Sequence, residues 1–248
     1  MKQVFLLSLV LLLYKTSSSQ NTTRLSTDRP DQKDGANILE KGKIQFETEM
    51  YQNTFEKGRA AIISSSLLRY GLFKNFEVRL LAEEGRERDK FIDETTQGLY
   101  PLALSFKLAL LKEHPFMPDI VLITYLKMPW TRRSSEDVYW SPAFILGLEK
   151  EINKFTLATN AGIKQSAFDE TWNSQLSADI EYRAGKHVEI FTEYFASYAN
   201  NKSPLHNADA GLLYYITNNW LIHLAYGSSV CAHECNRFVN TEFAFRFQ

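Results

Sequence analysis

The sequence predicts an all-β fold: a transmembrane, antiparallel, up-and-down β-barrel of about twelve strands. The first observation is an alternation with a period of two over residues 172–198, interrupted only at residues 184–186. Such a period indicates strands, because successive side chains of an extended chain point to opposite faces, and the short interruption indicates a hairpin. Each arm has about ten residues, enough to cross a bilayer at a tilt. One face is uncharged and bears aromatic rings, whereas the other carries carboxylates and Arg183.

The second observation is the order of the connections between the predicted strands. Every second connection is short, namely residues 71–75, 112–117, 150–154, 184–186 and 217–219. Most of the connections between them are longer and more polar. Barrels inserted from the periplasm have short turns at one rim and long loops at the other. A soluble sandwich has no reason to sort its loops in this way, so this pattern favours the membrane barrel.

The composition limits the functional classes. The formal net charge is −1 and the chain has no basic block, so we expect no nucleic-acid partner. The mildly negative mean hydropathy argues against helical membrane spans. It is compatible with a membrane barrel, because the polar face of the lumen lowers the average.

The N-terminus has the features of a targeting segment. Lys2 supplies positive charge, residues 4–13 are apolar, and the serines at 17–19 offer a cleavage site before Gln20. The apolar run is too short for a spanning helix. We therefore predict three parts: a signal peptide (residues 1–19), an N-terminal leader docked in the lumen (residues 20–42), and an outer-membrane β-barrel (residues 43–248). The predicted location is the bacterial outer membrane.

The first three predicted strands are residues 43–52, 60–70 and 76–83. The first and third alternate between apolar residues and carboxylates or Arg79, as expected of strands with one apolar face. The second is less regular, because adjacent apolar residues fall on both of its faces. The polar stretch 84–97 that follows is predicted to be a long loop.

The middle of the chain gives four more strands by the same alternation: residues 100–110, 120–128, 144–149 and 155–164. Pro115 and Pro118 bracket the connection between the first two. Residues 129–141 form a polar loop with two tryptophans, and together with 84–97 they are expected to make the outer vestibule. Residues 150–154 turn the last pair into a hairpin.

The last five predicted strands are residues 172–183, 188–198, 208–216, 220–228 and 238–247. Residues 200–207 form a loop before the third of them, and residues 217–219 form the turn after it. The final strand places Phe243, Phe245 and Phe247 on one face. It must pair with the first strand of the barrel, because a sheet in hydrocarbon cannot leave an unpaired edge.

Charged residues gather on the face that we assign to the lumen. They are Glu47, Glu49, Glu77, Arg79, Glu83, Lys107, Lys127, Lys164, Asp179, Glu181, Arg183, Glu189, Glu193, Asp209, Glu242 and Arg246. One interpretation is a pore that selects solutes by size and charge. The other is a network of paired charges that fills the interior, because buried charges must be paired or hydrated. The network explains any single residue better, and the pore is favoured for the set only by the family resemblance described below.

The leader carries a charged motif with a proline. Asp28, Arg29 and Asp31 surround Pro30, and Arg29 could pair with Glu47 or Glu49 from the periplasmic side. The leader would then be a plug or a gate. The alternative is a solvated leader that Pro30 stiffens. We favour docking, because an unstructured leader has no obvious use for this motif.

Two cysteines close a short segment of a predicted external loop. Cys231 and Cys235 flank His233, and thiolates with imidazole suit zinc. Only three candidate ligands lie together, and exported proteins meet an oxidising compartment. A local disulfide between Cys231 and Cys235 is therefore the first prediction, free thiols the second and a metal site the third. We predict no metal site and no cofactor.

The leader motif resembles one family in particular. Residues 27–32, followed by a Lys-Gly pair and a strand, are similar to members of the MetA-pathway of phenol degradation family. The likeness extends to residues 70–80, to Glu193, to residues 209–214 and 225–227, and to the aromatic last strand. The resemblance implies an outer-membrane β-barrel that moves small molecules, with hydrophobic or aromatic ones as candidates, and no defined catalytic residues. Gln248 departs from the pattern, because outer-membrane barrels commonly end in an aromatic residue.

The predicted function is therefore a channel or transporter that passes small molecules by diffusion through a charged lumen. We expect a monomer, with membrane lipid, a small solute and the insertion machinery as partners. One alternative is a plugged barrel without transport. Another is an outer-membrane lipid-modifying enzyme, which would need a Ser–His pair on neighbouring strands; no motif supports it, and we predict no enzyme. A third is a soluble periplasmic barrel with the apolar face inside.

Overall fold

In the computed structural model of the protein, the described residues are 24–28, 34–55, 58–89, 93–130, 138–200, 203–230 and 235–247. Their regular structure is entirely β. The strands are β1 (Ile44–Phe55), β2 (Arg59–Phe73), β3 (Phe76–Asp89), β4 (Glu94–Leu99), β5 (Ala103–Leu111), β6 (Asp119–Lys127), β7 (Ser141–Ile152), β8 (Phe155–Gln165), β9 (Trp172–Arg183), β10 (Val188–Ala199), β11 (Leu205–Thr217), β12 (Trp220–Ser229) and β13 (Asn236–Phe247). None of the described segments is a helix that is long and apolar enough to span a membrane.

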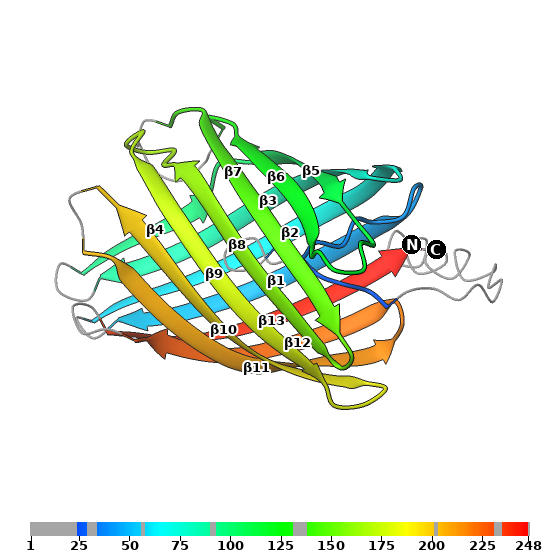
Figure 1. Cartoon of the computed structure of the whole chain (residues 1–248). Coiled ribbons are helices and arrows are strands. Elements are labelled where there is room, and N and C mark those ends of the chain that lie inside the picture. Colours follow the sequence, from blue (N-terminus) through cyan, green and yellow to red (C-terminus); the bar gives the residue numbers. More distant parts are fainter. Residues whose placement is uncertain are drawn as a thin grey trace, which may run out of the picture.

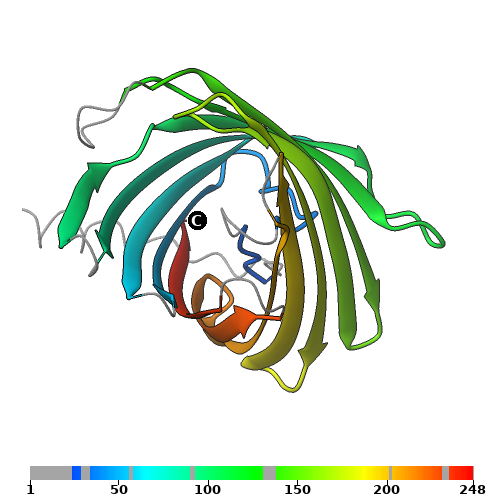
Figure 2. The same cartoon turned by 90° about the vertical axis from the view of Figure 1, so that its left-hand side faces the viewer.

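The strands close into a barrel. All pairings are antiparallel. Consecutive strands of the ring pair with each other, β3 pairs with β5 across the ring position that β4 leaves, and β1 pairs with β2 on one side and with β13 on the other. Figures 1 and 2 show the resulting ring. Twelve of the described strands form it, and β4 is an addition that pairs with β3. The predicted all-β barrel of about twelve strands is confirmed, including the pairing of the last strand with the first.

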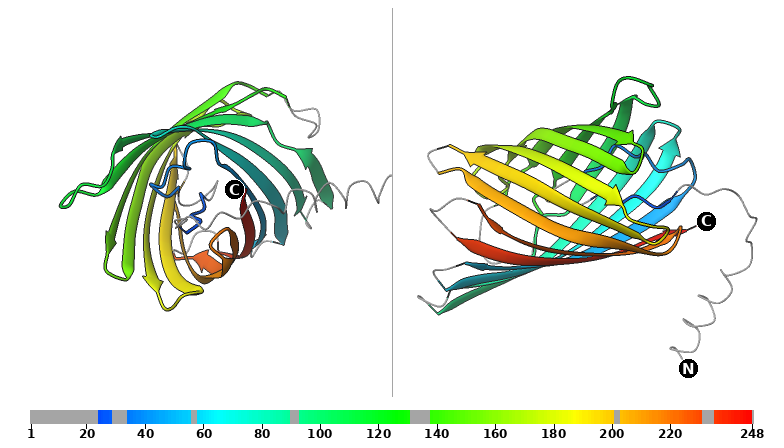
Figure 3. Two further views of the ribbon diagram at one scale, coloured as in Figure 1. Left: turned by 90° about the vertical axis from the view of Figure 1, so that its right-hand side faces the viewer. Right: turned by 60° about the horizontal axis from the view of Figure 1, so that its bottom comes forward.

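The prediction of a long loop at residues 84–97 is wrong. β3 continues to Asp89, and β4 runs back beside it from Glu94 to Leu99. Tyr100–Leu102 then interrupts the strand before β5, because Pro101 has no N–H to give to a ladder. Figure 3 shows the β3–β4 hairpin extending at the long-loop end of the barrel. Both faces of this hairpin are polar, so the sequence there lacks the alternation that marks a half-buried strand.

Several predicted boundaries also move. β7 runs from Ser141 to Ile152, which adds residues at both ends and leaves a turn of only Asn153 and Lys154. Asn153 adopts a left-handed conformation (φ 58°) in that turn, which asparagine tolerates better than most residues. β11 begins at Leu205, inside the loop predicted for residues 200–207. β5 begins at Ala103, after the interruption, rather than at residue 100.

The two faces of the wall differ in chemistry. Leu212 on β11 pairs with Ile190 on one side and Leu224 on the other, and all three side chains lie exposed on the outside. An inward row of the same part of the wall pairs Glu193 with Asp179 and Asp209, and all three are buried. Apolar residues therefore cover the outside of the barrel, and charged residues face its interior.

Two apolar clusters lie inside the barrel, and each includes one residue of the leader. Ala36 packs with a cluster from β2, β3, β5, β6 and β7, and Leu25 packs with one from β10 to β13. Asp28 and Asp34 form an isolated antiparallel bridge between the two leader segments. The blue segments within the ring in Figures 2 and 3 are these parts of the chain.

Candidate functional site

The first leader segment, residues 24–28, is held by the β10–β13 side of the barrel. The backbone N–H of Leu25 donates to the carbonyl of Asn218 at 2.9 Å. The Leu25 side chain is 1% exposed and packs with Leu221 and its neighbours. Arg24 pairs with Glu189 at 2.5 Å and also donates to the carbonyl of Lys186. These contacts place the segment at the short-turn end of the barrel.

The second leader segment, residues 34–40, is held by the opposite side. The N–H of Ala36 donates to the Glu149 carboxylate on β7 at 3.0 Å, and the N–H of Leu39 donates to Glu77 on β3 at 2.8 Å. Carboxylates of the wall thus satisfy backbone groups of the leader that no sheet satisfies, as buried N–H groups require. The two segments together bridge both halves of the wall.

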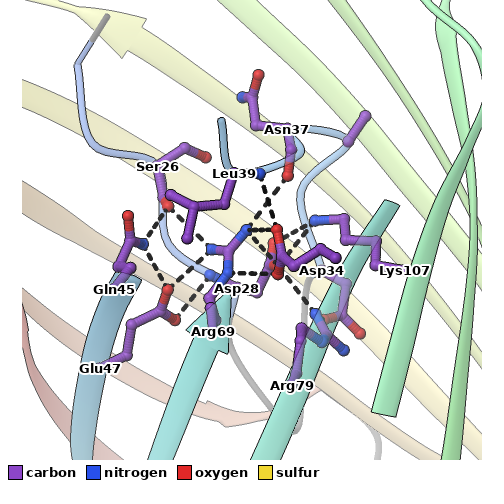
Figure 4. Close-up of polar contacts among 12 residues, drawn as sticks. Ser26, Asp28, Asp34, Asn37, Leu39, Gln45, Glu47, Arg69, Arg79 and Lys107 are labelled. Carbon is purple, nitrogen blue, oxygen red and sulfur yellow. Dashed lines mark hydrogen bonds and ion pairs between the residues drawn. The ribbon is translucent and has the colours of Figure 1, made fainter. Parts of the chain in front are cut away.

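Asp28 is the centre of the polar contacts between the leader and the wall (Figure 4). Its carboxylate lies 3.0 Å from Arg69 on β2, 2.9 Å from Arg79 on β3 and 2.7 Å from Lys107 on β5. Asp28 is fully buried. Burial by itself would raise the pKa of Asp28, but Arg69, Lys107 and Arg79 outweigh it and hold the pKa below the usual range. The leader therefore places an ionised carboxylate among three cations of the wall.

Arg69 joins this centre to both leader segments and to two wall carboxylates. Its guanidinium contacts Glu77 at 2.7 and 3.0 Å and Glu47 at 2.8 Å. It also donates to the carbonyls of Ser26 at 3.1 Å and Asn37 at 3.2 Å. Arginine can do this because its planar fork presents five donors.

Asp34 occupies a second position in the network. It accepts from Arg79 at 3.0 Å and from the Tyr125 hydroxyl at 3.1 Å. Burial raises the pKa of Asp34, and the nearby negative charge of Asp28 adds to this effect, while Arg79 opposes it. These two carboxylates of the leader therefore differ in the direction of their shift: the pKa of Asp28 is lowered, whereas that of Asp34 is raised.

The structure brings only part of the predicted lumen set together. Glu47, Glu77, Arg79 and Lys107 surround Asp28 or its direct partners. Elsewhere, Glu49 contacts Ser65 and Asn240; Glu181, Arg183 and Glu189 lie at the short-turn mouth; and Asp179 and Glu193 face inward across from the Asp28 centre on β9 and β10.

Some predicted residues lie outside the described part of the chain. Arg29 and Asp31 are among them, so the pairing of Arg29 with Glu47 or Glu49 stays a prediction. Cys231 and His233 are also outside it, and the disulfide between Cys231 and Cys235 stays a prediction too. Among the described residues, no group of three or more His, Cys, Asp or Glu side chains is arranged to hold a metal ion.

Sequence reasoning missed four residues of the site: Arg69, Asp34, Tyr125 and Glu149. Arg69 lies on the strand whose apolar residues fall on both faces, so its direction was not readable. Its register opposite Arg79 and Gln45 gives that direction, and register is known only from the structure. Tyr125 lies among apolar residues of its strand, and no pattern in the sequence distinguishes a tyrosine whose hydroxyl joins a polar network from one that only packs.

A cavity of about 1020 Å³ lies between the leader and the wall at the short-turn end. We call this cavity the vestibule; it is distinct from the outer vestibule that the sequence predicts at the long-loop end. Residues of the leader, the wall and the turns line it, among them Arg24, Asn37, Arg69, Lys112, Glu151 and Arg183. Because Arg69 is among its lining residues, the vestibule borders the network around Asp28.

A closed barrel with an apolar outside and a charged interior is the architecture of outer-membrane barrels. The fold is similar to the COG4313 outer membrane channel from Pseudomonas putida F1, with a TM-score of 0.69 and 13% identity over 90% of this chain and 100% of that one. It is also similar to the NanC porin (0.54, 8%, over 80% and 98%) and to the translocator domain of autotransporter NalP from Neisseria meningitidis (0.51, 11%, over 83% and 88%). None of the curated proteins compared with the chain matches it.

The sequence match identifies the family. Residues 27–247 match the family described as "Putative MetA-pathway of phenol degradation". The chain belongs to this family, and the resemblance carried by the leader motif and the strands is confirmed. The match begins at Thr27, so it includes Asp28 and the second leader segment as well as the barrel, but not residues 24–26.

Proposed function

We propose that this protein is an outer-membrane channel through which small molecules diffuse along a charged lumen, with the leader as its constriction. The observation that carries the proposal is the way in which the leader is held. The polar contacts of Asp28, Ala36 and Leu39 with the wall are hydrogen bonds and ion pairs to side chains of the wall rather than strand pairing. Side-chain contacts can be exchanged one at a time, whereas a strand inserted into the sheet would be permanent.

The surroundings of the leader support the same function. The vestibule of about 1020 Å³ gives a solute access to the lumen from the short-turn end. The apolar outside suits hydrocarbon, and the charged inside suits water and polar solutes. The structures to which the fold is similar include an outer membrane channel and a porin. The description of the family names phenol degradation, which suggests hydrophobic or aromatic solutes.

A plugged barrel without transport is the second candidate, and one observation favours it. Asp28, Arg79 and Lys107 are completely buried, so at their level charged side chains occupy space that a solute would need. The two candidates differ in whether the leader ever leaves this position. Conductance therefore separates them.

The test is the conductance of the refolded chain, from Gln20 onward, in planar bilayers. We expect small discrete steps, and larger or more frequent ones with Asp28→Asn, because the neutral amide loses the ion pairs that hold the leader. Glu94→Gln, an exposed change on the β3–β4 hairpin, is the matched control and should behave as wild type. The absence of conductance in both the wild type and Asp28→Asn would reject the channel in favour of the plugged barrel.

A further inference from the structure

We propose that Arg69, Arg79 and Lys107 form a binding site for a small carboxylate, and that the leader fills this site with its own carboxylate, that of Asp28. We call these three residues the cation site. Its part in transport depends on the proposed function, but the binding of a carboxylate is a property of the barrel wall alone. The ligand class that follows is a small organic acid in its ionised form.

The geometry is that of carboxylate recognition. Lys107 Nζ lies 2.7 Å from both oxygens of Asp28, and Arg79 Nη1 and Arg69 Nη2 lie 2.9 and 3.0 Å from Oδ2. Charge-assisted hydrogen bonds have these lengths. The donors come from three strands, and Figure 4 shows them converging on one point. The wall thus forms the site, and the leader contributes only the anion.

The charge balance of the wall requires an anion there. The three cations touch two carboxylates of the barrel, Glu47 and Glu77, both on Arg69. The wall by itself therefore keeps one positive charge in excess at a buried position. Buried charges are costly unless they are compensated, and Asp28 supplies the missing negative charge.

A second leader carboxylate lies beside the cation site rather than in it. Asp34 forms an ion pair with Arg79 at 3.0 Å, whereas Asp28 contacts Arg69, Arg79 and Lys107. Asp28 is therefore the carboxylate that occupies the point on which the three donors converge.

The vestibule borders the cation site. Arg69 is among its lining residues and also contacts Asp28, so a solute in the vestibule lies next to one edge of the site. A carboxylate that binds Arg69 competes with Asp28 for the same donors. Exchange of one carboxylate for the other would release the leader and conserve the charge of the lumen.

The experiment removes the tethered carboxylate and offers a free one. In Asp28→Ala the full chain keeps the three cations, and the space of the lost carboxylate between them becomes free for a probe. The probe is sodium acetate, with acetamide as its neutral counterpart, and the readouts are saturation transfer from the protein to the probe methyl group and the thermal midpoint. We expect saturable acetate binding to Asp28→Ala, at least about tenfold tighter than acetamide, because charge-assisted hydrogen bonds are roughly twice as strong as neutral ones.

Two variants serve as matched controls. Asp28→Asn fills the same volume with an amide, so acetate should bind it at least about tenfold more weakly. Asp28→Ala with Lys107→Met removes one donor and should lose acetate binding to a similar extent. If Asp28→Ala does not refold in plain buffer, the yield of folded barrel at rising acetate concentration is the readout, and only acetate should restore it.

This experiment can be distinguished from the conductance test, because it measures acetate binding, which can occur whether or not the protein conducts ions. Acetate that binds Asp28→Ala no better than acetamide, or equally well with and without Lys107, overturns the cation site even if the protein conducts. If Asp28→Ala does not refold and neither acetate nor acetamide restores folding, the cation site is overturned as well. Specific acetate binding to a protein that carries no current supports the site and leaves only its role in transport rejected.

Discussion

Arg69 on β2 and Glu77 on β3 form a two-point ion pair inside the barrel, with Nε 2.7 Å from Oε1 and Nη2 3.0 Å from Oε2. The same two residues also hold the leader. Arg69 donates to the carbonyls of Ser26 and Asn37, and Glu77 accepts the N–H of Leu39. One pair in the wall therefore fixes both segments of the leader, and the position of the leader depends on it.

Arg69→Met tests this dependence, because methionine keeps the unbranched stem and removes the charge. Glu77, Glu47 and Asp28 would each lose a buried cationic partner, and breaking a buried pair costs about 3–5 kcal/mol. We expect the free energy of unfolding, measured by urea titration in lipid vesicles, to fall by roughly that amount. Arg237→Met, an exposed change on β13, is the control and should have little effect. Equal stability of the two variants would contradict the prediction.

The leader should dock more tightly as the pH falls through the raised pKa of Asp34 toward the ordinary pKa of aspartate. Asp34 faces Arg79, Tyr125 and the charges of Asp28 and Lys107, and burial raises its pKa in the docked state. A carboxyl with a raised pKa holds its proton more firmly when docked, so docking strengthens as the pH falls through that pKa and weakens above it. Asp28 has the opposite shift: its contribution is present above the ordinary pKa of aspartate and is lost only as the pH falls through its lowered pKa.

The measurement is hydrogen exchange of the Ala36 and Leu39 amides from about pH 7 down to about pH 4, close to the ordinary pKa of aspartate, corrected for the intrinsic rate. Protection in the wild type should increase toward the lower pH. In Asp34→Asn the neutral amide mimics the protonated acid, so protection should be high at both ends of the range. Protection that decreases on acidification in the wild type would show that Asp34 does not control docking.

The fold could be predicted because the pattern that specifies it is local. In β9 and β10, successive residues point alternately to the uncharged outside and to an inside that carries the charges, and the sequence shows this directly. The same reasoning failed for residues 84–97, where both faces of the β3–β4 hairpin are polar. It also failed for the direction of Arg69, because β2 carries apolar residues on both faces.

The site was less predictable, because its contacts join distant parts of the chain. The motif at residues 28–31 predicted that the leader docks in the lumen, with Arg29 against Glu47 or Glu49, whereas the contacts that the structure describes are those of Asp28 with cations of the wall. Which charges meet depends on the path of the leader and on the register between β2 and β3. Neither is encoded in a local pattern, so the pairs Arg69–Glu77 and Asp34–Tyr125 could not be named from the sequence.

Leu212→Arg tests which face of the barrel meets hydrocarbon. Leu212 lies on the outside between Ile190 and Leu224, in a row of exposed apolar side chains. An arginine on the lipid face near the middle of a bilayer costs about 2–4 kcal/mol, and less near the interface. We expect that loss in unfolding experiments in lipid vesicles, and a smaller one for Leu205→Arg at the start of β11. Equal, small effects at both positions would mean that this face does not contact lipid.

Gly71→Ala should loosen the leader while leaving the barrel intact. A Cβ at this position would lie 2.2 Å from the carbonyl oxygen of Glu40 and 2.5 Å from that of Leu39. Both are backbone atoms of the leader, so the leader must move, at a cost typical of overpacking, about 1–3 kcal/mol. The bond from Leu39 to Glu77 should weaken first, and we expect faster amide exchange at Leu39 and larger conductance steps. Gly185→Ala, where a Cβ meets open space, is the control. Unchanged exchange at Leu39 in Gly71→Ala would show that the leader does not depend on this close approach.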